Sequence, residues 1–415
     1  MKTKLFLLAS IAFSLFCKAQ NVTIPDPIFK SYLVNNPAIN TNGDAQIQVS
    51  EATAFTGTID CSSRGIASMT GLEAFVNLKK LSCFGNLLTT LDVSKNTALT
   101  SIVCAGNQLA TLDVTKNLAL TELNLHTNQI STLDVSKNTL LTFLAFSNNL
   151  FTTIDVTKNT ALTDLVCENN LLTSLDVSKN TNLINLDAGN NQFTSLNLQN
   201  NAALEMLTVS LNPLTALDLT GNPALTILNA IGNNYTTIDL SKNTALLALD
   251  FTNGKLKSLD ISNNQLLELL LANSNQLLSV NLKNANNEGL VYVDLTGNPD
   301  LSCIQVDNME VANNYASLEY WIKDASATYS INCNSTLGLN DISKSDVKIY
   351  PNPTKSSVNW SVAADVEVYN TVGQSVLRVK NSSSVNLSKF SDGVYIIVLK
   401  DKNGKELRRS KVVKH

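Results

Sequence analysis

Leucine and isoleucine return along most of this chain at a long, fixed interval. The block Leu91-Asp92-Val93-Ser94-Lys95-Asn96 recurs from Leu112 and again from Leu133, so each start lies 21 residues after the last. Later copies begin at Ile154, Leu175, Leu196, Leu217, Ile238 and Leu259. The few apolar side chains of one period cannot be buried alone, so successive periods must stack into a continuous core. The pattern therefore predicts a repeat solenoid.

A second block precedes each copy of the first. In one period it is Leu99-x-x-Ile102-x-Cys104-x-x-Asn107-x-Leu109. Alternation along a strand points Ile102 and Cys104 inward and Val103 outward. We therefore predict one short parallel strand in each repeat.

This second block matches the leucine-rich-repeat signature, and the 21-residue period resembles the internalin-type repeats of bacterial surface proteins. The resemblance covers about residues 59–308. It implies an α/β-type solenoid of short parallel strands with a mostly irregular convex side. The ligand does not follow from the resemblance, because the fold hosts many. The register slips near Asn284 to Gly289, where about two residues are inserted.

An asparagine column follows the predicted strands. It consists of Asn86, Asn107, Asn128, Asn149, Asn170, Asn191, Asn212 and Asn233. Side-chain amides here can satisfy backbone groups that the bend after each strand would otherwise bury unpaired. Gly254 breaks the column, so we expect one looser turn there.

Four of the seven cysteines lie in the inner column of the repeats. They are Cys61, Cys83, Cys104 and Cys167. A metal or redox site is one interpretation, but no histidine lies in the column and the spacing is not that of CxxC pairs. We interpret the four as small buried hydrophobic residues.

The outward strand positions differ between repeats far more than the LDVSKN side does. An acidic patch consists of Glu122, Asp164, Glu168 and Asp187, and an apolar set consists of Phe143, Met206, Ile227, Ile231, Leu269, Leu271 and Tyr292. A shared framework demand would make these positions alike, so the concave strand face is predicted to bind a ligand. Two alternatives are drift on a tolerant surface and partial burial of these side chains by the fold itself.

The opposite side has a column of aspartates beside a column of lysines. Examples are Asp92 with Lys95 and Asp113 with Lys116. Like charges stacked at strand spacing, about 5 Å, would repel unless opposite charges lay between them. We interpret the pairing as charge balance on a solvated surface rather than a binding site.

The segment before the repeats predicts an N-terminal cap. Asp26 is a favourable N-cap and Pro27 a favourable first helical residue, so a helix is expected to seal the solenoid. The following stretch, Asn40 to Glu51, resembles an EF-hand loop. Calcium ligands there would be Asn40, Asn42, Asp44 and Glu51. Ala45 replaces the usual glycine, which favours the same turn held without metal, and no other cofactor is expected.

The chain ends in a different kind of unit. After a polar linker at 334–345, Val366–Asn370 and Gly393–Val398 alternate as strands, with turns at Gly373-Gln374 and Asp392-Gly393. The pattern predicts a small all-β, immunoglobulin-like sandwich. Residues 346–415 closely resemble the type IX secretion C-terminal sorting domain of Bacteroidetes. The resemblance implies a translocon and a sorting peptidase as export partners, then release or attachment to surface lipopolysaccharide.

The first residues predict export as well. Lys2 and Lys4 precede the short apolar run Leu5–Phe16, and Ala19 offers a cleavage point. The run is too short to span a membrane, and the bulky Phe16 argues against lipidation at Cys17. Because an exported chain meets oxidising conditions, Cys303 and Cys333 are predicted to form a disulfide that closes the end of the solenoid.

The predicted organisation has six parts. They are a signal peptide (1–19), an N-terminal cap (20–58), the solenoid (59–308), a C-terminal cap (309–333), the linker (334–345) and the sorting domain (346–415). The chain has 415 residues, of which 15% are charged, and a formal net charge of −4. With no basic stripe, nucleic acid is excluded as a partner, and no membrane insertion is expected.

Three classes of function remain. The favoured one is a secreted or surface adhesin-like protein that binds a protein or glycan of a host or neighbouring cell. A structural component of an extracellular matrix or biofilm is the alternative. An enzyme is disfavoured, because His126 and His415 are the only histidines. Asp164 and Asp187 could imitate a glycosidase pair, but an open face lacks a pocket that would raise the pKa of one carboxyl group.

Overall fold

The computed structural model divides the chain into two compact units, with the boundary between Ile331 and Asn332. It describes residues 20–333 and 347–415, apart from 372, 403 and 405. The expected signal peptide (1–19) and linker (334–345) lie outside the described residues. Each unit is considered by itself below.

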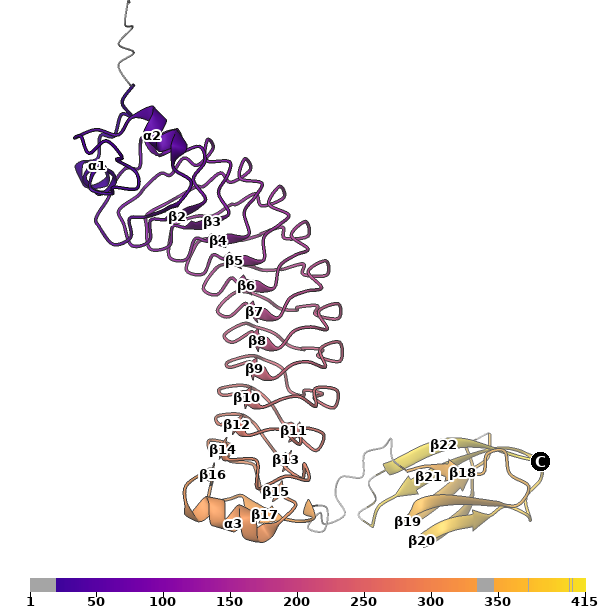
Figure 1. The fold of residues 1–415 in the computed structure, drawn as a ribbon. Coiled ribbons are helices and arrows are strands. Elements are labelled where there is room, and N and C mark those ends of the chain that lie inside the picture. The colour runs from indigo at the N-terminus through magenta and orange to yellow at the C-terminus, as the bar shows by residue number, and fades with distance from the viewer. Residues whose placement is uncertain (1–19, 334–346, 372, 403, 405) are drawn as a thin grey trace, which may run out of the picture. The chain divides into compact units, whose positions relative to one another are not determined.

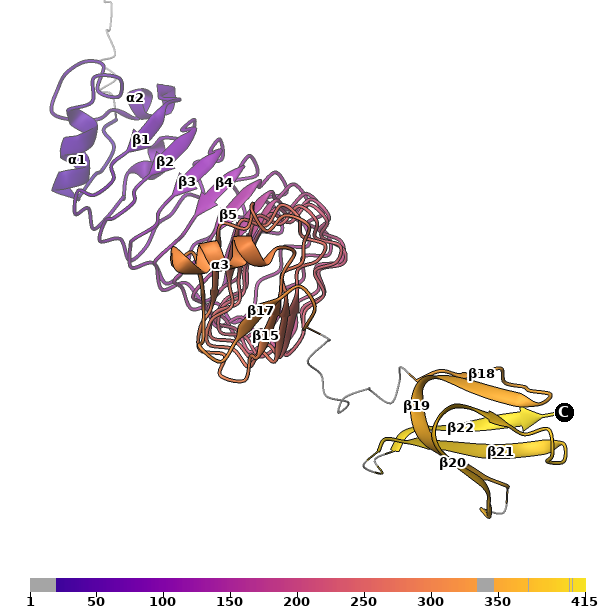
Figure 2. The same ribbon diagram turned by 90° about the horizontal axis from the view of Figure 1, so that it is seen from below.

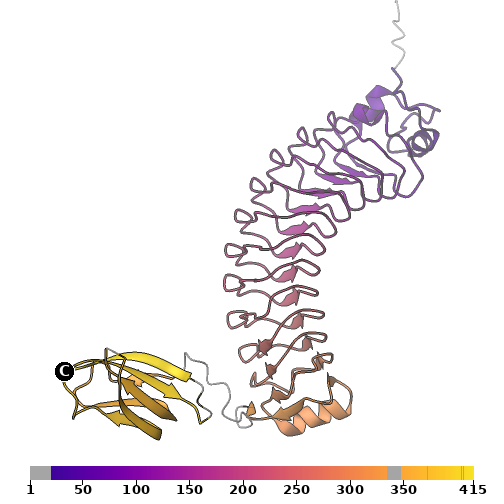
Figure 3. The same cartoon turned by 180° about the vertical axis from the view of Figure 1, so that it is seen from behind.

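Thirteen parallel strands form the main sheet of the first unit and pair in sequence order. Figure 1 shows them stacked along a curved solenoid, and Figure 3 shows the same succession from behind. The strands are β1 (Thr58–Asp60), β2 (Lys80–Ser82), β3 (Ser101–Val103), β4 (Glu122–Asn124), β5 (Phe143–Ala145), β6 (Asp164–Val166), β7 (Asn185–Asp187), β8 (Met206–Thr208), β9 (Ile227–Asn229), β10 (Ala248–Asp250), β12 (Leu269–Leu271), β14 (Tyr292–Leu295) and β16 (Trp321–Lys323). The predicted leucine-rich-repeat solenoid is confirmed.

The core follows the predicted alternation. Ile102 and Cys104 are fully buried, whereas Val103 is half-buried on the outer side. The equivalent Leu123 and Leu144 are also fully buried, so the inner column continues from turn to turn. Burial of a leucine side chain contributes roughly 1.5–3 kcal/mol, and only the neighbouring turns make that burial complete.

A second sheet covers the other side of the solenoid near its C-terminal end. Its four strands are β11 (Ser258–Asp260), β13 (Ser279–Asn281), β15 (Cys303–Gln305) and β17 (Thr328–Ser330). The repeat pattern did not predict this sheet, because the same kind of block forms no strand in the earlier repeats.

In the main sheet Leu269 pairs with Tyr292, two residues beyond the regular spacing, which confirms the predicted insertion.

The predicted asparagine column forms a hydrogen-bond ladder. The Asn107 Nδ2 donates to the carbonyl oxygens of Cys83 and Cys104, both at 3.0 Å. Its Oδ1 accepts from the Leu88 N–H at 3.0 Å. One side chain therefore joins two turns and satisfies both donors and acceptors that are buried.

The ladder is interrupted at Gly254, as expected from the sequence, and also at the preceding turn. A Cβ at this position would lie 2.6 Å from the Asn275 Oδ1, which already accepts from the Leu256 N–H. In the preceding turn the Asn233 Oδ1 is buried and has no hydrogen-bond partner among the described residues. The ladder is therefore incomplete at two successive turns.

A second asparagine ladder runs through the LDVSKN blocks. Its members are Asn96, Asn117, Asn138, Asn159, Asn180, Asn201, Asn222, Asn243 and Asn264, all fully buried. The Asn117 Nδ2 donates to the carbonyl oxygens of Val93 at 3.0 Å and Asn96 at 2.9 Å. The repeated block does not by itself indicate this role for its last residue.

The aspartates of the same block shape its turn. The Asp113 Oδ1 accepts from the Thr115 hydroxyl at 2.6 Å and from the Thr115 N–H at 2.8 Å. These hydrogen bonds lower the pKa of Asp113 more than the neighbouring Lys116 does. The aspartate column is therefore first a turn-forming feature, and charge balance with the lysines is secondary.

The N-terminal cap contains α1 (Pro27–Val34), α2 (Val49–Ala54) and the short 3-10 helix η1 (Leu72–Ala74). Asp26 is the N-cap of α1, and Phe29 and Leu33 are fully buried against the first turns. One Asp26 oxygen accepts from Ile28 and Phe29, and the other accepts from the backbone N–H groups of residues 67 and 68. A single carboxylate thus caps α1 and fastens it to the solenoid.

At the other end, α3 (Met309–Ser317) lies across the stack (Figure 2). Ala312 of α3 and Trp321 of β16 are buried, and the Trp321 Nε1 donates to the Leu290 carbonyl at 2.7 Å. Cys303 and Cys333 are both disulfide-bonded, and the other four described cysteines are free. Pairing of Cys303 with Cys333 stays a prediction.

The second unit is a five-stranded antiparallel sheet. Its strands are β18 (Ile349–Tyr350), β19 (Ser357–Tyr369), β20 (Ser375–Asn386), β21 (Gly393–Lys400) and β22 (Glu406–Lys414). Val358, Val368 and Ile397 are fully buried in its separate core. The predicted all-β character is confirmed, whereas the immunoglobulin-like arrangement is not.

We predict that Asn264→Ala lowers the free energy of unfolding by about 1–3 kcal/mol, because two buried carbonyl groups lose their donor. The Asn264 Nδ2 donates to Leu240 at 3.2 Å and to Asn243 at 2.8 Å. The matched control is Asn263→Ala, since Asn263 is exposed and bonds only its neighbour Ser262. Urea unfolding followed by circular dichroism measures both variants. Equal losses of stability in the two variants would contradict the stabilising role of the asparagine ladder.

A pH dependence is expected from Asp26. Burial opposes its ionisation, but four backbone N–H groups outweigh that effect and lower the pKa of Asp26. Its stabilising contribution is therefore complete above the unfolded-state pKa, about 3.9, and is lost as the pH falls through the lower folded-state pKa. Asp26→Asn should lower the melting temperature at neutral pH, and the difference from the unsubstituted chain should shrink toward pH 3. A difference that grows on acidification would contradict this account.

Candidate binding surface

The side chains that project from the main sheet away from the core form what we call the strand face. Parallel pairing places them in straight rows: Glu122 is in register with Phe143, and Phe143 with Asp164. The same row continues through Asn185 to Met206. A neighbouring row contains Asp187, two residues beyond Asn185 on β7. The predicted residues that belong to the strands therefore lie in rows on one face of the sheet, whereas Glu168 and Ile231 lie in the turns after β6 and β9.

Asp164 is held in place by its neighbours. The Thr163 hydroxyl donates to one of its oxygens at 2.7 Å, and the Asn185 Nδ2 donates to the other at 2.6 Å. Glu122 accepts from the Ser101 hydroxyl at 2.8 Å. None of these donors carries a positive charge, so they fix the carboxylates without neutralising them.

Glu168 and Asp187 form the most perturbed part of the acidic patch. Burial raises the pKa of Asp187, and the Gly189 N–H opposes the shift only in part. Burial and the nearby Asp187 carboxylate raise the pKa of Glu168, while His126 acts in the opposite direction. The two carboxylates thus lie close enough to repel each other.

Ser147 lies on the turn between those of His126 and Glu168. It has the same position in its repeat as His126 and Glu168 have in theirs, 21 residues away on either side. The stacking is direct, because the Thr127 N–H donates to the Ser147 carbonyl at 2.9 Å and the Asn148 N–H to the Glu168 carbonyl at 3.0 Å. The Ser147 side chain is buried, and its hydroxyl has no hydrogen-bond partner among the described residues.

The apolar residues of the strand face are less exposed than an open surface would suggest. Met206 is 46% exposed, whereas the other six are half-buried: Phe143, Ile227, Ile231, Leu269, Leu271 and Tyr292. Partial burial, one of the two alternatives considered from sequence, therefore applies to most of the set. The side chains remain accessible, but each offers only part of its surface to a partner.

The arrangement has few features of a catalytic centre. His126 does not hydrogen-bond Ser147, the serine of the adjacent turn, so the two do not form a nucleophile and base. Asp164 and Asp187 lie on neighbouring strands but in different rows. Within the described part of the chain, no group of three histidine, cysteine or acidic side chains could hold a metal ion.

The four inner-column cysteines behave as buried hydrophobic residues. Burial raises the pKa of Cys61 and of Cys104 to about 12 and shifts Cys83 and Cys167 in the same direction. Thiols with such pKa values stay protonated at neutral pH and are poor nucleophiles and metal ligands. The structure therefore favours the interpretation that they fill the core.

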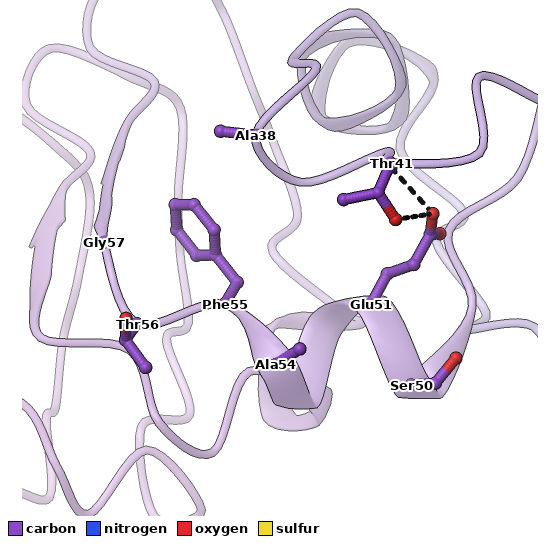
Figure 4. Close-up of a pocket in the computed structure, with 8 residues that line it drawn as sticks. All are labelled: Ala38, Thr41, Ser50, Glu51, Ala54, Phe55, Thr56 and Gly57. Atoms are coloured by element: carbon purple, nitrogen blue, oxygen red, sulfur yellow. Dashed lines mark hydrogen bonds between the residues drawn. The ribbon is translucent and has the colours of Figure 1, made fainter.

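The EF-hand-like loop uses its oxygens for internal hydrogen bonds. One Glu51 oxygen accepts from the Thr41 N–H at 2.8 Å and from the Thr41 hydroxyl (Figure 4), and the other accepts from Gln48. Asp44 accepts from Gln46, Gln48 and Asn42. Figure 4 shows the shallow pocket beside this loop, where the Phe55 ring stands between Ala38 and Ala54.

These contacts favour the interpretation in which the turn is held without metal. The Asn40 and Asn42 side-chain oxygens accept from Gly43 and Asp44, so every predicted ligand already has a donor from the loop. Calcium needs six to eight oxygens directed at one point. Burial opposes ionisation of Glu51, but bonds from Gln48, Asn42 and Thr41 lower its pKa overall. The protein itself therefore stabilises the ionised carboxylate.

Comparison with known proteins identifies the second unit. Residues 348–414 match the family described as the secretion system C-terminal sorting domain. The predicted sorting domain is thus confirmed, and it implies export to the cell surface or secretion. No helix among the described residues is long and apolar enough to cross a membrane. A search of curated proteins finds no match.

Solved structures support the fold of the first unit. An internalin (inlF) from Listeria monocytogenes is 21% identical, with a TM-score of 0.54 over 76% of this chain and 99% of that one. The leucine-rich effector protein YopM from Yersinia pestis is 19% identical, with a TM-score of 0.50 over 70% and 87%. The functional domain of InlJ from Listeria monocytogenes is 23% identical, with a TM-score of 0.44 over 95% and 98%. The first two show that the solenoid has the leucine-rich-repeat fold.

We predict that calcium leaves the melting temperature of the full chain unchanged, because the loop oxygens are already satisfied. Glu51→Gln should lower the melting temperature equally with calcium and with a chelator, since it removes the negative charge that four hydrogen bonds stabilise and replaces one accepting oxygen with an NH2 donor that faces backbone N–H groups. Differential scanning calorimetry measures both effects. A calcium-dependent rise that Glu51→Gln abolishes would establish the metal site instead.

Proposed function

We propose that this protein is a secreted or cell-surface binding protein, adhesin-like, whose strand face recognises a protein or glycan of a host or neighbouring cell. The sorting domain supports this proposal, because export brings the solenoid into contact with such partners. Binding rather than catalysis fits the strand face, which has neither a nucleophile–base pair nor, among the described residues, a metal-ligating group.

The observation that supports the proposal most is the contrast between the two sides of a repeat. On the LDVSKN side each aspartate and asparagine makes the same bonds in successive turns, as at Asn96 and Asn117. On the strand face, residues in register change from Glu122 to Phe143 to Asp164. Framework contacts therefore explain the constant side, whereas the strand face is free to differ for recognition.

Arrays of glycans and extracellular proteins would test the proposal with the purified full chain. We expect a binding partner whose signal is lost in the triple variant Phe143→Ala, Ile227→Ala, Leu271→Ala, because these side chains supply the apolar contact. The matched control is Leu118→Ala, Leu140→Ala, Leu266→Ala. Those three leucines are more than half exposed and lie in turns outside the strands.

Melting temperatures of both triple variants would show that the solenoid remains folded. Equal loss of binding in the two variants would contradict recognition by the strand face. If no array component binds the folded chain and the chain self-associates, a structural role in an extracellular matrix would replace the proposal.

A further inference from the structure

Charge on the strand face is of one sign over most of its length. From β3 to β14 in sheet order, the charged residues on the strands are Glu122, Asp164, Asp187, Asp250 and Asp294. No lysine or arginine lies on any of these strands. Glu168 adds a further carboxylate in the turn that follows β6. Over this region, no basic strand residue neutralises the carboxylates.

Apolar side chains are interleaved with these carboxylates. Phe143 lies in register between Glu122 and Asp164, so an acidic residue neighbours it on each adjacent strand. Met206 and Ile227 continue the same row beyond Asn185. A ligand that follows this row would therefore meet two carboxylates with Phe143 between them, and then the apolar side chains of Met206 and Ile227.

Two of the carboxylates, those of Asp187 and Glu168, are also less well solvated than ordinary surface acids. Asp187 and Glu168 both have pKa values raised by burial, and Asp187 raises that of Glu168 further. Their ionised forms are thus less stabilised by water and by the protein than the ionised form of an exposed carboxyl group. A cation placed beside them would replace both the lost hydration and the missing counter-charge.

We infer that the strand face from β4 to β9 binds a positively charged polypeptide segment. Its lysine or arginine side chains pair with Glu122, Asp164 and the Glu168–Asp187 pair, and its apolar side chains contact Phe143 and Ile227. This inference rests on the proposed function and names the partner's chemistry. Anionic glycans and nucleic acids are repelled by the same carboxylates, and neutral sugars gain no ion pairs from them.

Fluorescence anisotropy with the full chain would test this inference. The probe is a short labelled peptide of alternating lysine and leucine, and its comparison peptide has glutamate in place of lysine. The variant Asp164→Asn, Glu168→Gln, Asp187→Asn should bind the lysine peptide about tenfold more weakly or worse, because three ion pairs are lost. Added salt should weaken binding to the unsubstituted chain, and the glutamate peptide should not bind.

The matched control is Asp113→Asn, Asp134→Asn, Asp155→Asn, which changes the net charge equally on the LDVSKN side. All three aspartates are exposed, and asparagine retains the Oδ1 that accepts the turn hydrogen bond. Unchanged affinity in this control supports the inference. Equal weakening in both triple variants would indicate bulk charge attraction and overturn it, as would failure of the lysine peptide to bind the unsubstituted chain.

Binding to the partner found on the arrays distinguishes a failure of this inference from a failure of the proposed function. If the apolar triple variant loses binding to that partner while the acidic-patch variant keeps it, the strand face recognises a partner, but that partner is not a positively charged segment. If the apolar variant keeps the partner, the proposed function itself is wrong.

Discussion

Most successive turns of this solenoid are joined by buried asparagine side chains that hydrogen-bond backbone groups of two adjacent turns. A turn made of short strands and bends leaves many N–H and carbonyl groups without regular partners, and burying each of them unpaired would cost about 1–3 kcal/mol. Asn107 and Asn117 represent the two ladders, one on each side of the core. With both in place, stacking can repeat through the whole first unit.

The ladders also explain why the two sides of the repeat differ so much. The LDVSKN side contains Asn117 and the turn-forming Asp113, so most substitutions there would break a backbone contact. The strand face needs only an inward leucine at the centre of each strand. The repeat does not require a particular residue at its outward positions. These residues can therefore differ, and between β4 and β9 they form an acidic and apolar surface.

The chain combines this surface with a domain that directs export. The sorting domain folds around its own core, centred on Val358, Val368 and Ile397, and the solenoid has a separate one. Separate cores allow each unit to fold and act by itself. A cationic polypeptide outside the cell is the kind of partner that an exported acidic surface would meet and attract.

The sequence alone determined the solenoid, its strand positions, the Asp26 cap and the sorting domain, because each follows from local patterns that repeat or match a motif. Only the tertiary structure decided which oxygens of the EF-hand-like loop accept hydrogen bonds from within the loop, since Glu51 accepts from Thr41, ten positions earlier in the sequence. It also decided the left-handed backbone of Thr127 and Leu211, at φ 54° and 56°, where local preference favours glycine or asparagine. Stacking imposes one turn geometry on every repeat, whatever residue is present. The perturbed Glu168 and the unpartnered Ser147 hydroxyl likewise arise only when turns 21 residues apart are placed in contact.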